Sequence, residues 1–150
     1  MRYCLFLILA VATLVTACNK DKFTTTPQVK IKSISPSEVF FSDIIRMQGS
    51  FTDEEGDVDS VLIVYKWYNG STAIPRDTFR YKLDVLNVPD KTRQADIEVT
   101  FEYHTNNNPD LRFLPSVLKD TNATFGLILK DKDGNRSEYA ESDQIRLKNN

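Results

Sequence analysis

Cysteine is nearly absent from this chain of 150 residues, and both copies, Cys4 and Cys18, lie close to its N-terminus. The region after residue 18 therefore has no pair of thiols to cross-link, so its stability has to come from a hydrophobic core. A domain of this length buries enough apolar surface to fold without such cross-links.

Residue types suited to catalysis are also scarce. His104 is the only histidine, and it ends an expected strand beside a run of asparagines, where we expect a loop residue rather than a general base. The sequence shows no glycine-rich phosphate loop and no serine that spacing connects to a histidine and an acid. Paired carboxylates are present, but glycosidase chemistry also needs a deep cleft. We therefore expect a protein that is not an enzyme.

The chain also lacks a large excess of charge of either sign, because its 19 Lys and Arg nearly balance its 21 Asp and Glu, for a formal net charge of -2. Such a balance provides no basic field for nucleic acid and no polybasic patch for lipid headgroups. We expect no nucleic-acid partner.

The one long apolar run lies at the N-terminus. Arg2 precedes an apolar stretch from Tyr3 to Val15, which is too short for a permanent transmembrane helix and is typical of a secretory signal. The run ends in small residues, and a cysteine stands where the mature chain would begin: Val15-Thr16-Ala17-Cys18. An ordinary signal peptide has no need of that cysteine.

These four residues resemble the lipobox of bacterial lipoproteins. The resemblance implies that residues 1–17 are removed as a signal peptide and that Cys18 becomes lipidated, with a diacylglycerol on its thiol and an acyl chain such as palmitate on its amino group. Two or more chains hold a protein firmly at a membrane, since each buried methylene contributes about 0.8 kcal/mol. The alternatives are a cleaved signal with a chance cysteine and a short uncleaved anchor.

Residues 18–27 are expected to form the lipidated cysteine and a short tether, because Phe23 to Pro27 is largely threonine and has no apolar periodicity. In some Gram-negative lipoproteins a basic residue before two acidic ones directs export to the outer face. Lys20-Asp21 resembles that signal and Lys22 departs from it. We expect a lipid anchor in the outer membrane, and we favour the cell surface over the periplasmic face.

From residue 28 onward the dominant hydrophobic period is two, as in Asp96 to Tyr103, where every second residue is apolar. This alternation predicts strands with one buried face. Ser60 to Tyr68 is apolar on both faces and predicts a central strand. A short helical turn is expected within 105–122. The expected strands cover 28–34, 44–51, 60–68, 77–86, 95–104, 123–131 and 138–148.

This pattern predicts one all-β domain over residues 28–150, folded as an immunoglobulin-like antiparallel β-sandwich of about seven strands. It resembles the Ig-like or fibronectin-III-like modules of bacterial surface lipoproteins, and Trp67 lies in the third strand, where that fold often buries a tryptophan. Such an architecture says little about function.

Two acidic loops, 52–59 and 131–138, are expected at the same end of the sandwich. They resemble the Asp-rich loops of bacterial Ig-like and cadherin-like repeats, where such side chains can hold calcium, which takes about six to eight oxygen ligands. Neither loop fits the EF-hand pattern, because the glycines come too early. The candidate calcium ligands are Asp53, Asp57, Asp59, Asp131, Asp133 and Asn135.

Other interpretations of these residues stay open. Glu-Gly-Asp and Asp-Gly-Asn are good turn sequences in their own right. The neighbouring acids can also be neutralised without metal by nearby basic residues: Lys130, Lys132 and Arg136. The aromatic group of Tyr65, Trp67 and Tyr68 suits either a glycan platform or the core.

Two functions from different classes follow. The first is a lipid-anchored, non-catalytic Ig-like module that binds or presents a glycan or protein partner at the outer membrane, with the acidic loops as its binding surface. The second is a structural accessory subunit of an envelope assembly, which acts through a sheet edge such as Val29 to Ile34.

Overall fold

The computed structural model describes residues 24–149. The expected signal peptide (residues 1–17), Cys18 and most of the tether therefore lie outside the described residues.

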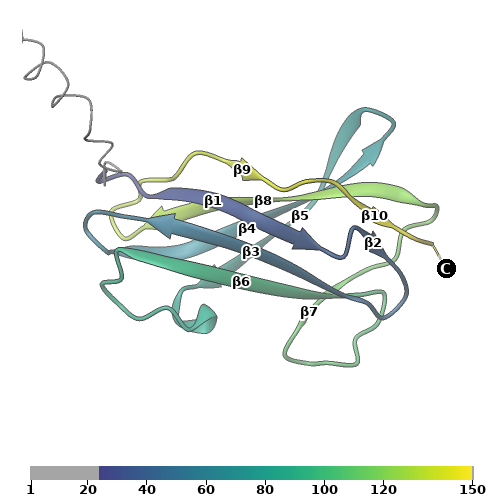
Figure 1. Ribbon diagram of the computed structural model, residues 1–150, viewed down its shortest axis with the longest axis horizontal. Coiled ribbons are helices and arrows are strands. Elements are labelled where there is room, and N and C mark those ends of the chain that lie inside the picture. The colour runs from purple at the N-terminus through teal and green to yellow at the C-terminus, as the bar shows by residue number, and fades with distance from the viewer. Residues whose placement is uncertain (1–23, 150) are drawn as a thin grey trace, which may run out of the picture.

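Two β-sheets face each other and make up the domain (Figure 1). The first sheet has the strand order β1-β3-β6-β7, and the second has the order β2-β10-β8-β4-β5, with β9 also paired to β8. Neighbouring strands are antiparallel except for the parallel pairs β2 with β10 and β6 with β7. The elements are β1 (Gln28–Ser35), β2 (Glu38–Val39), β3 (Ile44–Thr52), β4 (Val58–Asn69), β5 (Thr72–Lys82), the 3-10 turn η1 (Asp84–Leu86), β6 (Gln94–Tyr103), β7 (Arg112–Leu114), β8 (Thr121–Asp131), β9 (Ala140–Glu141) and β10 (Ile145–Leu147).

The prediction of an all-β domain is confirmed, and five expected strands match β1, β3, β4, β6 and β8 within two residues at each end. The expected strand 138–148 is divided into β9 and β10, and β2 and β7 are additional short strands. β4 is central, since it pairs with β5 on one side and β8 on the other.

Two expectations were wrong in detail. The expected strand 77–86 begins earlier, at Thr72, and stops at Lys82, because the chain turns into η1 and Asn87 adopts a left-handed conformation with φ of 57°. Leu83, the next residue in the apolar alternation, is still buried, but Val85 after it is 65% exposed. The helical turn expected within 105–122 is instead β7, which extends the first sheet alongside β6.

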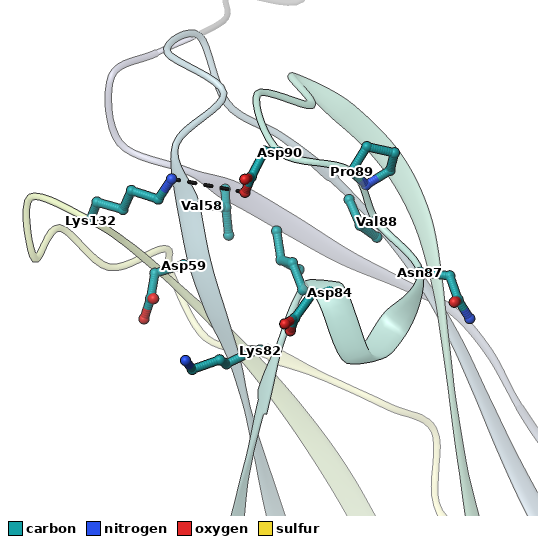
Figure 2. A pocket seen from close by; sticks show the side chains of 10 residues that line it. Val58, Asp59, Lys82, Asp84, Asn87, Val88, Pro89, Asp90 and Lys132 are labelled. Carbon is teal, nitrogen blue, oxygen red and sulfur yellow. Dashed lines mark ion pairs between the residues drawn. The ribbon is translucent and has the colours of Figure 1, made fainter.

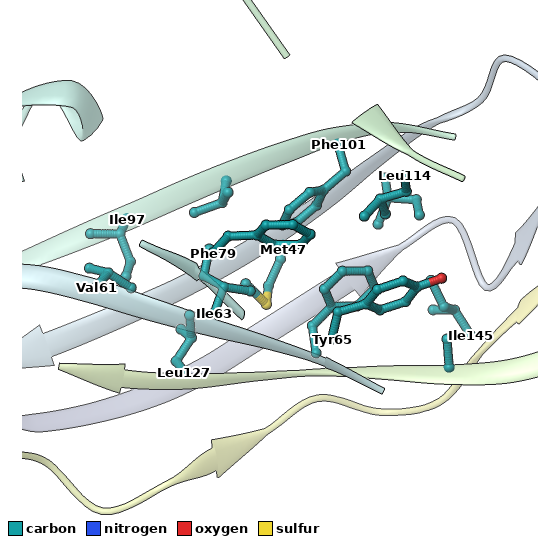
Figure 3. Close-up of a cluster of buried hydrophobic side chains, with 14 of the residues drawn as sticks. Met47, Val61, Ile63, Tyr65, Phe79, Ile97, Phe101, Leu114, Leu127 and Ile145 are labelled. Atoms are coloured by element: carbon teal, nitrogen blue, oxygen red, sulfur yellow. The ribbon is translucent and has the colours of Figure 1, made fainter. Parts of the chain in front are cut away.

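The core lies between the two sheets, where the inward positions of the alternating strands meet (Figure 3). Met47 and Phe101 come from the first sheet, and Ile63, Tyr65 and Phe125 come from the second. Burying one such side chain contributes about 1.5–3 kcal/mol. The packed sheets hold the connecting loops at the two ends of the domain, where the candidate sites are found.

Candidate functional site

One end of the domain is built from the loops that follow β3 and β8. β3 and β8 both end there, and β1 begins there (Figure 1). We call residues 53–57 and 131–135 the acidic end. The described chain enters the fold at this end, since the backbone N–H of Glu54 donates to the carbonyl of Thr24 over 3.3 Å.

The loop after β3 is folded around the side chain of Asp53. Its Oδ2 accepts the backbone N–H of Asp57 over 2.9 Å, and its own N–H donates to the carbonyl of Arg93 over 2.8 Å. Gly56 has a φ of +68°, and a Cβ there would lie 2.8 Å from the carbonyl oxygen of Lys91. Only glycine fits this turn, which brings the carboxylates of Glu55 and Asp57 together.

The loop after β8 is folded around Asp131, which is also buried. Its Oδ1 accepts the backbone N–H of Asn135 over 2.7 Å, and its Oδ2 accepts the side-chain amide of Asn135 over 2.8 Å. The backbone N–H of Lys132 donates to the carbonyl of Asp57 over 3.1 Å. This bond joins the two loops and places Asp133 beside the first loop.

Three carboxylates meet where the loops join. One oxygen from each of Glu55, Asp57 and Asp133 lies within 4.8 Å of the others. Behind them Asp53 is 0% exposed, and Oδ1 of Asp53 and Oδ1 of Asp57 are both buried without a hydrogen-bond partner. A buried carboxylate oxygen without a partner costs free energy, because it has lost its hydration.

The acids of this end repel one another. Desolvation raises the pKa of Asp57 above its ordinary value, and the neighbouring Asp53 and Asp131 raise it further. The pKa of Glu55 is raised by desolvation and then by the charges of Asp57 and Asp133. Among residues 24–149, none of the ion pairs involves these five carboxylates: Lys32 to Asp96, Lys66 to Glu141, Arg80 to Asp59, Lys132 to Asp90, Arg146 to Asp120, and Lys148 to Glu38 and Asp120.

The structure brings together some of the ligands expected from sequence and separates others. Asp57 and Asp133 meet, Asp53 lies behind Asp57 and accepts its backbone N–H, and Asp131 holds the second loop. Asn135 donates to Asp131 rather than lying in the carboxylate group. Asp59 is not part of the carboxylate group, since it pairs with Arg80 over 2.6 Å. The hydrogen bond from Arg80 lowers the pKa of Asp59.

Glu55 was not among the expected ligands, although it stands between two of them in the sequence. Loop residues follow no fixed period, so the side to which Glu55 points depends on the turn at Gly56. The glycine directly after Glu55 is the signal that indicates such a turn.

A pocket of about 520 Å³ lies beside the acidic end (Figure 2). Its lining is charged, with Lys82 and Lys132 facing Asp59, Asp84 and Asp90. Lys132 points toward Asp90 across the pocket, with 3.9 Å between Nζ and Oδ1. The lining charges are mixed in sign, unlike the unpaired acids of the neighbouring loops.

The opposite end of the domain is apolar. Four large hydrophobic side chains are exposed on its loops and on β7: Phe40, Phe41, Phe113 and Leu118. Phe41 is 53% exposed and Leu118 is 94% exposed. We call residues 40–43 and 104–120 the apolar end. His104 lies within it, half-buried, with its ring centroid 4.6 Å from that of Phe41.

The aromatic group of β4 does not form one open platform. Tyr65 is buried in the core, where its ring stacks on Phe125. Trp67 is half-buried, donates through Nε1 to the hydroxyl of Tyr65, and carries the guanidinium of Arg76 over its ring at 4.0 Å. Tyr65 therefore takes the fully buried place that was expected for Trp67.

The fold and its two ends define a two-sheet, all-β domain with one acidic and one apolar end. No protein-family model and no curated protein matches the chain. Among solved structures, it is similar to the sporulation control protein Spo0M from Bacillus subtilis, with a TM-score of 0.45, 10% identity, and coverage of 83% of this chain and 50% of that protein. The chain thus spans about half the length of that structure. A Niemann-Pick type C2 protein from Japanese carpenter ant is similar with a TM-score of 0.40, 13% identity, and coverage of 84% and 94%.

Among residues 24–149, no helix has the length and apolar character needed to cross a membrane.

Proposed function

We propose that this protein is a lipid-anchored, non-catalytic module of the bacterial outer membrane, which binds or presents a protein or glycan partner. The observation that carries the proposal is the polarity of the domain. Thr24 joins the fold at the acidic end, and the exposed aromatic and aliphatic side chains lie at the opposite end.

The short tether between Cys18 and the fold determines which end of the domain faces the membrane. Five residues lie between Cys18 and Thr24, and the six residue steps from one to the other span at most about 20 Å when fully extended. If Cys18 carries the lipid, the acidic end is held near the membrane surface and the apolar end faces away. This orientation moves the proposed binding surface from the acidic loops to the apolar end.

The exposed side chains of the apolar end support a binding role. Phe41 is 53% exposed, and Leu118 lies almost entirely in solvent. Groups of apolar side chains exposed on the surface of a folded domain are typical of interaction sites. Aromatic residues are also enriched in the cores of protein interfaces. We favour display on the cell surface, where such a partner is accessible.

The proposed fold is an immunoglobulin-like sandwich. The chain crosses from one sheet to the other after β1, β2, β3, β5 and β7, while β1 pairs with β3 and β8 with β10. These crossings and pairings support the Ig-like or fibronectin-III-like arrangement.

Lipid labelling tests the anchor. Cells that express the full-length chain are fed radiolabelled palmitate, and we expect label on the protein, loss of label in Cys18→Ser, and release of that variant from the envelope. Cys4→Ser is the matched control, because residue 4 lies in the segment expected to be removed, and it should label normally. A Cys18→Ser protein that still sediments with the envelope contradicts the anchor.

Site-specific photo-cross-linking tests the orientation and the binding surface. A photoreactive residue placed at Phe41 or Leu118 should give discrete cross-linked products on intact cells. The same residue at Asp133 of the acidic end, or at the exposed Glu98 of β6, serves as the control. Products from positions 133 and 98 alone would exclude the apolar end as the binding surface.

The free edge of the first sheet favours a second candidate, a structural subunit of an envelope assembly. Among residues 24–149, β1 pairs with β3 alone, so its other edge has backbone groups with which another strand can pair. A bulge between Ile31 and Ser33 interrupts the pairing of this strand with β3. Under this candidate Ser33→Asp should disrupt assembly in size-exclusion chromatography of solubilised envelopes, while Leu118→Ser should leave the assembly intact.

A further inference from the structure

We propose that the acidic end binds one calcium ion through the carboxylates of Glu55, Asp57 and Asp133. The buried carboxylate of Asp53 lies behind the site, where it accepts the backbone N–H of Asp57. The site is argued from residues of the folded domain alone, so it does not depend on the lipid anchor or on the binding surface at the opposite end.

The spacing of the three outer carboxylates suits a shared ion. Oxygens that bind one calcium at about 2.3–2.6 Å lie at most about 5 Å apart. The chosen oxygens of Glu55, Asp57 and Asp133 lie within 4.8 Å of one another. They come from two loops that are joined by the bond from Lys132 N–H to the Asp57 carbonyl, so the packed strands hold the site in place.

Asp53 provides the independent observation. Its side chain is fully buried, and its Oδ1 has no hydrogen-bond partner. Its Oδ2 accepts the backbone N–H of Asp57 over 2.9 Å, and Oδ1 of Asp57 is also buried and unpartnered. Each such oxygen is unfavourable in the ion-free protein because it has lost its hydration, and a cation bound next to these carboxylates offsets that loss.

The unbalanced negative charge of the acidic end also favours binding of a cation. Five carboxylates gather at this end, and no Lys or Arg among residues 24–149 forms an ion pair with any of them. Like charges at this spacing repel one another. A divalent ion removes this repulsion, and its binding then links the two loops.

The donors favour calcium over magnesium. All of them are hard oxygens on loops, and Asp133 is exposed to solvent, which leaves room for water ligands. Calcium accepts irregular geometry with about six to eight oxygens, whereas magnesium demands a tight octahedron and releases its water reluctantly.

Calorimetric titration of the full-length lipoprotein in detergent micelles tests the site, after removal of metal with EDTA. We expect CaCl2 to give saturable one-to-one binding with a dissociation constant of about 10⁻⁴ to 10⁻³ M. The unfolding temperature should rise with calcium concentration. MgCl2 should bind roughly tenfold more weakly or not at all.

Two variants separate a site from an ordinary acidic turn. Asp57→Asn should weaken calcium binding by roughly tenfold or more, and its ion-free form should unfold at a higher temperature than the ion-free wild type, because one repelling charge is removed. Asp59→Asn is the matched control. It lies two residues away, pairs with Arg80, and should leave calcium affinity unchanged.

Several results would overturn the proposal. The proposal is wrong if the folded wild type gives no saturable heat of calcium binding and its unfolding temperature does not shift at about 10 mM calcium. Equal binding of magnesium and calcium would indicate a general acidic surface instead. Equal losses in Asp57→Asn and Asp59→Asn would have the same meaning. If Asp57→Asn fails to fold, the exposed Asp133→Asn replaces it with the same expected loss of affinity.

Discussion

The rings of Phe101 on β6 and Phe125 on β8 lie with their centroids 4.9 Å apart and their planes tilted by 31°. The two residues belong to different sheets, and both are fully buried. This contact is therefore a direct link between the two layers of the domain. It continues on one side to Tyr65, whose ring stacks on Phe125, and on the other to Phe79, whose ring centroid is 5.6 Å from Phe101.

Truncation of this link should be among the most destabilising changes in the domain. Phe101→Ala is expected to lower the free energy of unfolding by about 3–5 kcal/mol, because it removes buried surface and leaves a cavity between the sheets. Denaturant unfolding followed by fluorescence measures the change. Glu98→Gln, at an exposed position on the same strand, is the control and should stay within about 0.5 kcal/mol of wild type. A loss for Phe101→Ala no larger than for the control would mean that the sheets are not joined here.

The main strands could be predicted from sequence because their buried faces are continuous. In β6 the residues Ile97, Val99, Phe101 and Tyr103 are all buried, as their alternation predicts. In β4 one face is largely buried, and the apolar residues of the other face, such as Leu62 and Val64, are partly buried. The strand is central because it pairs with β5 and β8.

The short elements could not be predicted, since they carry no period. β2 has two residues and β7 has three, and β7 exists because Arg112 to Leu114 pair with the end of β6. The apolar residues between Leu111 and Leu118 suggest a short helical turn in the sequence. In the structure Leu114 and Val117 are buried while Leu118 points into solvent.

At the acidic end, too, only part of the arrangement could be predicted from the sequence. Topology alone indicates that the loops after β3 and β8 meet, and they do, through the Lys132 to Asp57 backbone bond. The partner of each carboxylate depends on local geometry. Asp59 lies on β4, where it reaches Arg80 on the neighbouring strand β5, and no spacing rule separates it from Asp57.

The loop that follows β6 depends on one buried carboxylate. Glu102 accepts the hydroxyl of Thr105 and the backbone N–H groups of Asn107 and Asn108, the latter two over 3.2 and 2.9 Å. The hydrogen bond from Thr105 lowers the pKa of Glu102, and the bond from Asn108 lowers it further.

Glu102→Gln should loosen this loop, because the amide nitrogen of glutamine cannot accept the bond that one carboxylate oxygen accepts now. We expect the backbone amide that loses its acceptor, that of Asn107 or of Asn108, to exchange with solvent roughly tenfold faster. Hydrogen exchange measured by NMR gives the rates, with the Ile97 amide in the middle of β6 as an internal reference. Unchanged rates at both asparagines would show that the carboxylate does not hold the loop.

Gly126 on β8 is covered by the ring of Tyr139. A Cβ at position 126 would lie 2.0 Å from Cε2 of that ring, so Gly126→Ala must displace the tyrosine, which also lies under the ammonium of Lys66 at 4.2 Å. Because Tyr139 is partly exposed, it can swing outward, and the expected loss is about 1–2 kcal/mol.

A double-mutant cycle checks this account of Gly126. Tyr139→Ala should cost about as much as Gly126→Ala, and the double variant should be hardly less stable than either single variant, since the same contact is lost once. Additive losses in denaturant unfolding would mean that the alanine methyl group disturbs something other than the ring.

The ion-free domain should be more stable in mild acid than at neutral pH. The pKa values of Asp57 and Glu55 are raised in the folded state, so the folded protein binds these protons more tightly than the unfolded chain does. Lowering the pH from 7 to about 5 therefore stabilises the fold. Nearer the ordinary values of 3.8 and 4.5 this gain ends. The groups with lowered pKa, Asp59 and Glu102, then take up protons, and stability falls.

Thermal unfolding in EDTA across this range measures the effect, and Asp57→Asn identifies its source. The variant lacks one of the two titrating groups and relieves the other of a repelling charge, so its unfolding temperature should change less between pH 7 and about pH 5 than that of the wild type. Asp96→Asn, which removes an exposed carboxylate paired with Lys32, should keep the wild-type profile. A wild-type unfolding temperature that falls steadily from neutral pH downward would show that the acids of this end do not repel one another. The same result would remove the electrostatic reason for a cation between them.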